Sequence, residues 1–246
     1  MREIFEQCTI SNNQIKLPNI QLERSLYLKV SKSLTALGGK WVGGKTQAFV
    51  FNFDPTAHLN RLIDGETDVK KKIQFFPTPK DLAAKLVGLV DLNESHSILE
   101  PSAGQGSLID AIRNTGIMQQ IHICEIDPVN VDILNKKYND VYILANDFLT
   151  LNPENSLEFY DRIIANPPFS HNQDIKHIMK MYACLKTNGV LVSFASTSWQ
   201  HTSTNVAKQF RAWLEDVNAE VIDIDKGAFS ESGTQIPTVI LKIRKR

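Results

Sequence analysis

Residues 98–107 read Ile-Leu-Glu-Pro-Ser-Ala-Gly-Gln-Gly-Ser, an apolar run that ends in an acid and is followed by a loop with two glycines. This pattern is typical of a buried strand that turns tightly into a helix. The third glycine of the dinucleotide-binding pattern is missing, and no Gly-Lys-Ser/Thr of a phosphate-binding loop follows. The loop therefore suits a nucleoside ligand with an amino-acid tail, and a plain strand-to-helix turn is the alternative.

Around this stretch, from Phe75 onward, short apolar runs alternate with segments of helical periodicity. Strands are expected at 97–99, 121–124, 141–144, 162–165, 190–194, 220–224 and 238–243, and helices at 81–90, 108–114, 128–137, 174–185 and 205–217. Strands separated by helices form a parallel sheet with covered faces. No helix is evident between the last two strands, so one of them is expected to run antiparallel. The predicted fold class is α/β, Rossmann-like, with a mostly parallel seven-stranded sheet and helices on both faces.

The chain before residue 70 has a different pattern. Residues 22–37 show helical periodicity, and Gly38-Gly39 stops it. Two β-like runs at 40–42 and 47–51 flank Gly43-Gly44 and predict a hairpin. The polar, charged stretch 64–72 suits a linker. We therefore expect a small N-terminal helix–hairpin module with its linker over residues 1–70, and a second domain over residues 71–246.

Composition limits the classes of function. The 246 residues are 42% hydrophobic with zero net charge, which is not the strongly basic profile of a protein that coats nucleic acid. Local basic groups could still bind phosphates, and the candidates are Lys40 to Lys45, Lys70 to Lys72 and Arg244 to Arg246. No apolar run approaches a membrane span, and no secretory signal is evident.

The cysteines and histidines indicate neither a disulfide framework nor a metal site. Cys8, Cys124 and Cys184 lie far apart and are odd in number, and the histidines show no metal-binding spacing. We therefore expect a reduced, cytoplasmic protein with neither a membrane nor a metal partner.

Acidic residues end the next two predicted strands. Glu125 lies about twenty residues past the glycines, the spacing at which a carboxylate accepts hydrogen bonds from ribose hydroxyls. A surface acid is the alternative, and Asp127 before Pro128 is expected to start a helix. Asp147 follows the third strand and can accept a hydrogen bond from an adenine amino group, while Phe148 can flank the adenine ring. The alternative is that Asp147 caps a helix or loop.

Residues 163–169, Ile-Ile-Ala-Asn-Pro-Pro-Phe, follow the fourth strand and carry the most specific chemistry. An exocyclic amine on an aromatic base is a poor nucleophile because its lone pair is delocalised into the ring. The side-chain oxygen of Asn166 and the carbonyl of Pro167 can accept from its N–H groups and localise that pair. The two prolines keep these acceptors preorganised, and Phe169 can stack on an extruded base. A Pro-Pro loop with a core phenylalanine is the alternative.

At these residues the sequence resembles the class I S-adenosylmethionine-dependent methyltransferases, and within them small phage- and plasmid-type DNA adenine-N6 methyltransferases with an Asn-Pro-Pro-Phe motif. The resemblance covers roughly Phe75 to the C-terminus. It implies that the glycine loop holds the methionine part of S-adenosylmethionine, Glu125 its ribose, Asp147 with Phe148 its adenine, and Thr78 its carboxylate end. The implied cofactor residues are Phe76, Thr78, Glu100, Pro101, Ser102, Ala103, Gly104, Gly106, Glu125, Ile126, Asp147, Phe148 and Asn166. The implied catalytic residues are Asn166, Pro167, Pro168 and Phe169.

The implied function is methyl transfer from S-adenosylmethionine to an exocyclic amino group, with N6 of adenine in DNA as the expected target. Three alternative targets remain: N2 of guanine in RNA, N4 of cytosine, and the side chain of a glutamine in a protein. Glutamine methyltransferases, however, usually carry Tyr where Phe169 stands. A non-catalytic DNA-binding or restriction-blocking protein of the same fold is the rival from another class. The N-terminal module, with Lys40, Lys45 and Lys70 to Lys72, is expected to contact DNA. His171, Asn172 and Asp174 either contact substrate or form the exposed start of a helix.

Overall fold

The computed structural model describes residues 1–51, 54–65, 77–151, 159–225, 227–229 and 236–246. Contacts divide the chain into two compact units. The small unit comprises Met1–Pro77 with Phe229–Thr234, and the large unit comprises Thr78–Ala228 with Gln235–Arg246.

The small unit is built from short helices and a four-stranded antiparallel sheet. Its elements are α1 (Arg2–Glu6), β1 (Thr9–Ser11), β2 (Gln14–Lys16), α2 (Arg24–Ala36), β3 (Lys40–Val42), β4 (Ala48–Val50) and α3 (Thr56–Ile63). The sheet order is β1-β2-β4-β3. The expected helix and hairpin are confirmed as α2 and β3–β4. The sequence did not predict α1, α3 or the β1–β2 hairpin. These elements have between three and eight residues, which is too short for a reliable period.

The small unit has a hydrophobic core of its own. Val30 and Leu34 from one side of α2 pack with Phe49 of β4, and all three side chains are fully buried. Phe5 of α1 and Leu59 of α3 close the same cluster. A helix with one buried side leaves its opposite side to solvent.

The large unit alternates strands and helices as expected. Its strands are β5 (Ile98–Glu100), β6 (Ile121–Cys124), β7 (Val141–Ala145), β8 (Tyr160–Ala165), β9 (Leu185–Ser196), β10 (Glu220–Asp223) and β11 (Thr238–Arg244). Its α-helices are α5 (Lys80–Val90), α6 (Ser107–Arg113), α7 (Pro128–Lys137), α9 (Gln173–Ala183), α10 (Ser198–His201) and α11 (Asn205–Asp216). Short 3-10 turns occupy Phe148–Thr150 (η1) and Ser170–Asn172 (η2).

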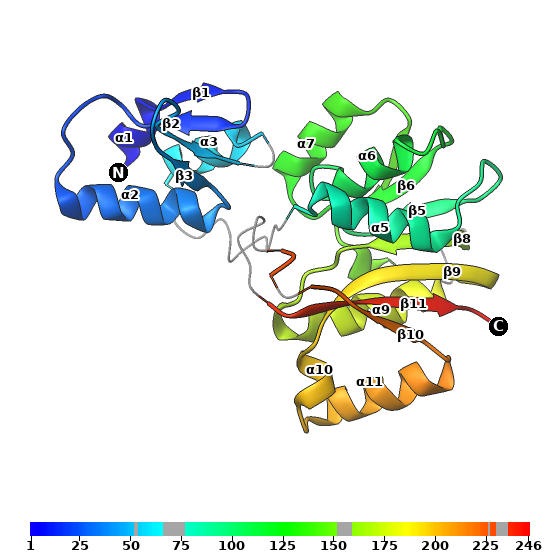
Figure 1. The fold of residues 1–246 in the computed structure, drawn as a ribbon. Helices are drawn as coiled ribbons and strands as arrows, with labels where there is room; N and C mark the ends of the chain where they lie inside the picture. Colours follow the sequence, from blue (N-terminus) through cyan, green and yellow to red (C-terminus); the bar gives the residue numbers. More distant parts are fainter. Residues whose placement is uncertain (52–53, 66–76, 152–158, 226, 230–235) are drawn as a thin grey trace. The chain divides into compact units, whose positions relative to one another are not determined.

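The seven strands form one sheet in the order β10-β11-β9-β8-β5-β6-β7 (Figure 1). The neighbouring pairs β7–β6, β6–β5, β5–β8 and β8–β9 are parallel. Strand β11 runs antiparallel to both of its neighbours, β9 and β10. The predicted Rossmann-like sheet, including its one antiparallel strand, is confirmed. Strand β9 begins at Leu185, where we expected the end of a helix, because the polar stretch 186–189 hides the first part of the strand from pattern reading.

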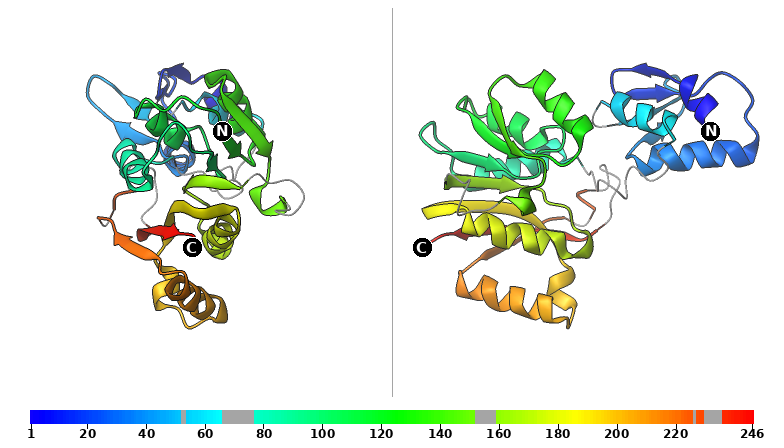
Figure 2. Two further views of the ribbon diagram at one scale, coloured as in Figure 1. Left: turned by 90° about the vertical axis from the view of Figure 1, so that its right-hand side faces the viewer. Right: turned by 180° about the vertical axis from the view of Figure 1, so that it is seen from behind.

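Both faces of the large sheet are covered. Leu99, Ile163 and Leu191 of the sheet join Ile178 of α9 and Phe210 of α11 in one buried cluster. On the other face, α5 contacts β8, β9 and β11. Helix α5 lies in front of the sheet in Figure 1, and α9 lies in front of it in the reverse view of Figure 2. Burial on both faces explains why these strands are near-continuous apolar runs.

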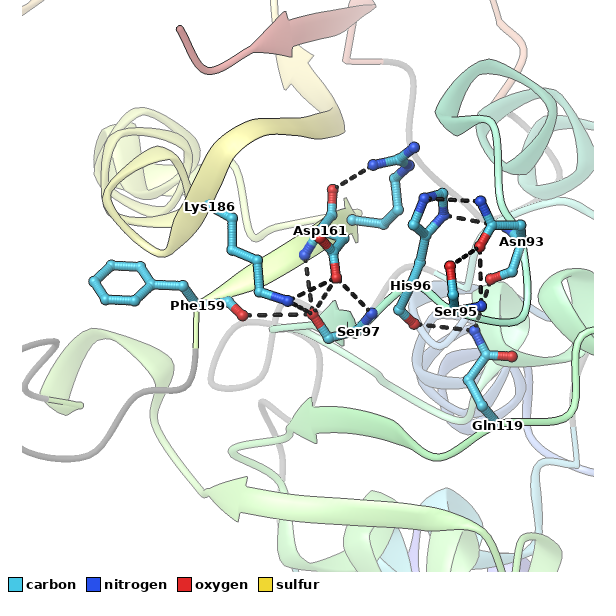
Figure 3. A network of polar contacts seen from close by, with 9 residues as sticks. Asn93, Ser95, His96, Ser97, Gln119, Phe159, Asp161 and Lys186 are labelled. Atoms are coloured by element: carbon cyan, nitrogen blue, oxygen red, sulfur yellow. Dashed lines mark hydrogen bonds and ion pairs between the residues drawn. The ribbon is translucent and has the colours of Figure 1, made fainter.

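The central strands β5 and β8 are tied together at their amino ends (Figure 3). The backbone N–H and the hydroxyl of Ser97 donate to Oδ2 of Asp161 at 2.9 and 2.7 Å, and Nζ of Lys186 donates to the same oxygen at 2.8 Å. Partial burial opposes ionisation, but the hydrogen bonds from Lys186 and Ser97 lower the pKa of Asp161 to about 2. This network fixes the register of the two strands whose opposite ends carry the candidate site.

Candidate active site

The chain order reverses between β5 and β8, because β6 and β7 follow β5 on one side and β9 follows β8 on the other. In open α/β sheets, ligands bind beyond the carboxyl ends of the strands at such a switch point. The glycine loop leaves β5 at this edge, and the Asn166 loop leaves β8 beside it. Topology alone therefore brings the two most informative sequence motifs together.

The glycine loop is held tightly at its base. The N–H of Ala103 donates to the carbonyl of Cys124 at 3.0 Å, which joins the loop to the end of β6. Gly106 is the N-cap of α6 with a φ of 86°, a left-handed conformation that favours glycine. A Cβ built there would lie 2.4 Å from the hydroxyl oxygen of Tyr138. That hydroxyl donates to the Gly106 carbonyl at 2.9 Å and to Asp110 at 2.6 Å.

Two buried acids, Glu100 and Glu125, lie beneath this loop. The Glu125 carboxylate accepts from the N–H of Gly104 at 2.7 Å and from the N–H of Asp127 at 2.8 Å. Burial raises the pKa of Glu125 to about 7, although these backbone hydrogen bonds act in the opposite direction. Burial, and then repulsion by Glu125, raises the pKa of Glu100 well above its ordinary value.

The polar atoms of the loop fit S-adenosylmethionine. Glu100 Oε2 and Ser102 Oγ are buried, and neither has a hydrogen-bond partner among the described residues. Buried polar groups in native proteins are almost always paired, so such atoms need a partner. The ammonium and carboxylate of a methionine tail bring complementary donors and acceptors, and Glu125 at the end of β6 can meet ribose hydroxyls.

The remaining expected cofactor residues differ in their surroundings. Ile126 is 61% exposed beside Glu125, and Asp127 caps α7 as expected, with Oδ1 accepting from the N–H of Val129 at 3.1 Å. Asp147 caps η1 by accepting from the N–H of Leu149 at 2.8 Å, and its contact with adenine stays a prediction. Phe148 is 2% exposed in the core, so its contact with adenine stays a prediction. Pro101 is buried, and Phe76 lies outside the described residues.

The Asn166 loop is anchored to the start of the large unit. Nδ2 of Asn166 donates to the hydroxyl of Thr78 at 3.1 Å, and Thr78 immediately precedes Pro79, the N-cap of α5. Pro167 is buried, whereas Asn166, Pro168 and Phe169 are partly exposed. The structure thus groups Thr78 with the loop and leaves the amide and the phenyl ring accessible at the edge of the sheet.

The sequence did not predict the structural role of Asp174. We expected an exposed helix start or a substrate contact, but Asp174 is 1% exposed. Its Oδ2 accepts from the N–H and the hydroxyl of Ser196 at 2.9 and 2.8 Å. This joins the beginning of α9, directly after the Asn166 loop, to the end of β9. Sequence spacing gives no signal for a partner 22 residues away, because an acid in a first helical turn is also the ordinary sign of an exposed cap.

Comparisons with known proteins show the family of the chain. The N-6 DNA Methylase family matches residues 63–191. The Type II methyltransferase M.HincII of Haemophilus influenzae is 32% identical over 126 residues, which are 50% of this chain and 22% of that protein. The modification methylase CviBIII of Paramecium bursaria Chlorella virus NC1A is 26% identical over 196 residues, 70% of this chain and 50% of that protein. The chain therefore spans half or less of the length of these two relatives.

Among solved structures, the M protein of the Type I restriction enzyme EcoKI aligns with a TM-score of 0.56 at 13% identity, covering 92% of this chain and 55% of that one. The 23S rRNA methyltransferase ErmE aligns with a TM-score of 0.53 at 17% identity, covering 70% of each chain. These likenesses concern the fold, which is that of the class I methyltransferases. The chain belongs to the N-6 DNA Methylase family, whose cofactor is S-adenosylmethionine.

None of the helices that the structure describes is long and apolar enough to cross a bilayer. Within the same residues, no group of three or more His, Cys, Asp or Glu side chains is arranged to hold a metal ion.

Proposed function

We propose that the chain transfers a methyl group from S-adenosylmethionine to N6 of adenine in DNA. The observation that carries this proposal is the hydrogen bond from Asn166 to Thr78 at the switch point of the sheet. It orients a carboxamide beside a loop whose unpartnered buried oxygens suit the cofactor. An oriented acceptor for an amine next to a methyl donor is what amino methylation requires.

The residues of the Asn166 loop align and activate the amine. The Asn166 side-chain oxygen and the Pro167 carbonyl accept from the two N–H bonds, which localises the nitrogen lone pair. Phe169 stacks on the extruded base and holds its plane. When bound, S-adenosylmethionine supplies an electrophilic methyl group. Holding the nitrogen in line with that group accounts for most of the acceleration, because proximity and orientation lower the barrier by about 7–11 kcal/mol.

The amine needs no strong base. Once methylated, its nitrogen is positively charged and acidic, so the proton passes readily to water or to the accepting oxygens. The site accordingly relies on acceptors and not on a histidine or lysine, which agrees with an Asn-Pro-Pro-Phe loop that has no ionisable side chain.

DNA is favoured as the substrate by the family and by the restriction-modification relatives M.HincII and CviBIII. RNA is the competing substrate, because the ribosomal RNA small subunit methyltransferase A of Prochlorococcus marinus is 31% identical over 94 residues.

The test is transfer of a labelled methyl group from S-adenosylmethionine to unmodified duplex DNA, with an RNA duplex of the same sequence in parallel. Asn166→Ala is compared with the unchanged protein after both are shown to bind the cofactor. Transfer to DNA that is lost in the variant supports the proposal. Transfer to RNA alone, or cofactor binding without any transfer, contradicts it.

A further inference from the structure

Positive charge is concentrated in one segment of the small unit. The chain as a whole is neutral, but between Glu23 and Asp54 its charged residues are all basic: Arg24, Lys29, Lys32, Lys40 and Lys45. We call residues 24–51 the basic segment; they include α2, β3 and β4. A local excess of lysine and arginine is the electrostatic footprint of a polyanion-binding surface.

The basic side chains of α2 lie on its solvent side. Val30 and Leu34 are fully buried, whereas Arg24, Lys29 and Lys32 are exposed. At 100° a residue these three fall within one arc of the helix, opposite the buried pair. They therefore project together from the small unit.

The hairpin adds an exposed aromatic to this charge. All three residues of β3 are exposed, and Trp41 is 47% exposed and Val42 41% exposed. The Trp41 ring meets the buried Phe49 edge-on, with 5.2 Å between ring centroids, so its orientation is fixed. Strand β3 is also an edge of its sheet. Trp41 is not part of the buried cluster of the small unit, so its exposed face is available to a partner.

We propose that the outer face of α2 and the β3–β4 hairpin bind the DNA substrate. This rests on the proposed function. Lysines and arginine contact phosphates, and Trp41 packs on the sugars between them, so the surface holds the DNA backbone. On this proposal the small unit binds DNA, and the large unit carries the residues for methyl transfer.

The test uses the full chain and a fluorescently labelled DNA duplex, with anisotropy measured over a series of salt concentrations. Lys29→Gln/Lys32→Gln should weaken binding by about tenfold at low salt and reduce the slope of log K against log salt by about two. The matched control Lys85→Gln/Lys208→Gln removes the same charge from exposed sites of the large unit and should leave both quantities unchanged.

Trp41 is tested separately. Trp41→Ala should weaken DNA binding by about tenfold or more. DNA should also quench the fluorescence of the unchanged protein, and Trp41→Phe should abolish most of that quenching. Trp199 is 5% exposed, and the partly buried Trp213 packs against Tyr182 and Phe210 of the large unit, so both should contribute less than Trp41 to quenching.

The proposal is overturned if the α2 and Trp41 variants bind DNA as the unchanged protein does. It is also overturned if an RNA duplex is bound more tightly and suffers the same losses. Methyl transfer is measured on the same samples. DNA binding through the basic segment without methyl transfer would refute the proposed function but not the surface, and full transfer with unchanged affinity in the variants would refute only the surface.

Discussion

Nδ2 of Asn166 donates to the hydroxyl oxygen of Thr78 at 3.1 Å, which joins two loops 88 residues apart in the sequence. Because Thr78 engages the nitrogen of the amide, the oxygen, which lies in the same plane on the opposite side of the Cβ–Cγ bond, is directed away from Thr78. An amide held in this way presents an acceptor in a fixed direction, which is the property that amino methylation needs.

Thr78→Val keeps the shape of the side chain and removes the hydroxyl. We expect kcat to fall by about 10- to 100-fold, because small misalignments of reacting groups cost that much. The fall in kcat should exceed any rise in the dissociation constant of S-adenosylmethionine, whose carboxylate end Thr78 is also expected to meet, and Thr78→Ser should restore most of kcat. Single-turnover rates and cofactor titration separate the two effects. A loss confined to cofactor affinity would show that Thr78 serves the cofactor and not Asn166.

Gly106→Ala tests the packing beneath the glycine loop. The added Cβ would meet Tyr138, which cannot move without losing its hydrogen bonds to the Gly106 carbonyl and Asp110. Gly116 has nearly the same φ, 88°, but a Cβ there meets nothing within 4 Å.

Gly116→Ala is therefore a control that carries the backbone strain alone, about 1 kcal/mol. We expect Gly106→Ala to lower the free energy of unfolding by about 2 kcal/mol more than Gly116→Ala does. Equal losses in chemical denaturation would show that Tyr138 gives way easily.

Glu125 makes the protein sensitive to pH. Its pKa is raised to about 7 in the folded protein from an ordinary value of 4.5. Between these values the folded state holds the proton more tightly, so this contribution is full below pH 4.5 and is lost as pH rises through 7. Its size is on the order of 3 kcal/mol, at about 1.4 kcal/mol per pKa unit. Glu125→Gln should flatten the fall in stability between pH 5 and 7.5, measured by chemical denaturation.

Cofactor affinity should show the opposite trend with pH. Ribose hydroxyls donate to a charged carboxylate better than to a neutral one. Binding of S-adenosylmethionine should therefore strengthen as pH rises through 7, and Glu125→Gln should bind more weakly with no such rise. A cofactor titration that is independent of pH between 6 and 8 in the unchanged protein would contradict a ribose role for Glu125.

Asp174 should position the Asn166 loop through α9. Asp174→Ala leaves the N–H and the hydroxyl of Ser196 without their acceptor, so we expect a loss of about 3 kcal/mol in the free energy of unfolding. Asp174→Asn keeps one acceptor oxygen and should recover most of this stability. Ser196→Ala removes only the hydroxyl bond and should cost about 1 kcal/mol.

If the contact between Asp174 and Ser196 positions the loop, Ser196→Ala should lower kcat several-fold while leaving cofactor affinity unchanged, and Asp174→Asn should retain most of kcat. An unchanged kcat in a stable Ser196→Ala protein would show that the contact serves stability alone.

The alternation of apolar runs and helices was sufficient to predict the large sheet, because each buried parallel strand leaves a run such as residues 121–124 that periodicity can detect. The glycine and proline loops were detectable because each directly follows one of these apolar runs. Contacts between distant segments were not. The pairing of Asp174 with Ser196, and the packing of Tyr138 on Gly106, depend on tertiary distances that no local pattern encodes.

Burial also separated residues that looked alike in the sequence. Phe148 and Phe169 both follow a strand and both looked like aromatic walls of a pocket, but Phe148 lies in the core at 2% exposure whereas Phe169 is partly exposed. The difference arises because η1 turns Phe148 toward α9, where its ring lies 5.8 Å from that of His177.

The most direct test of the central claim is nucleoside mass spectrometry of duplex DNA incubated with the full chain and S-adenosylmethionine, beside Asn166→Ala. The account predicts N6-methyladenine with the unchanged protein and none above background with the variant, while both bind the cofactor. A different methylated nucleoside, or N6-methyladenine formed equally by Asn166→Ala, would contradict it.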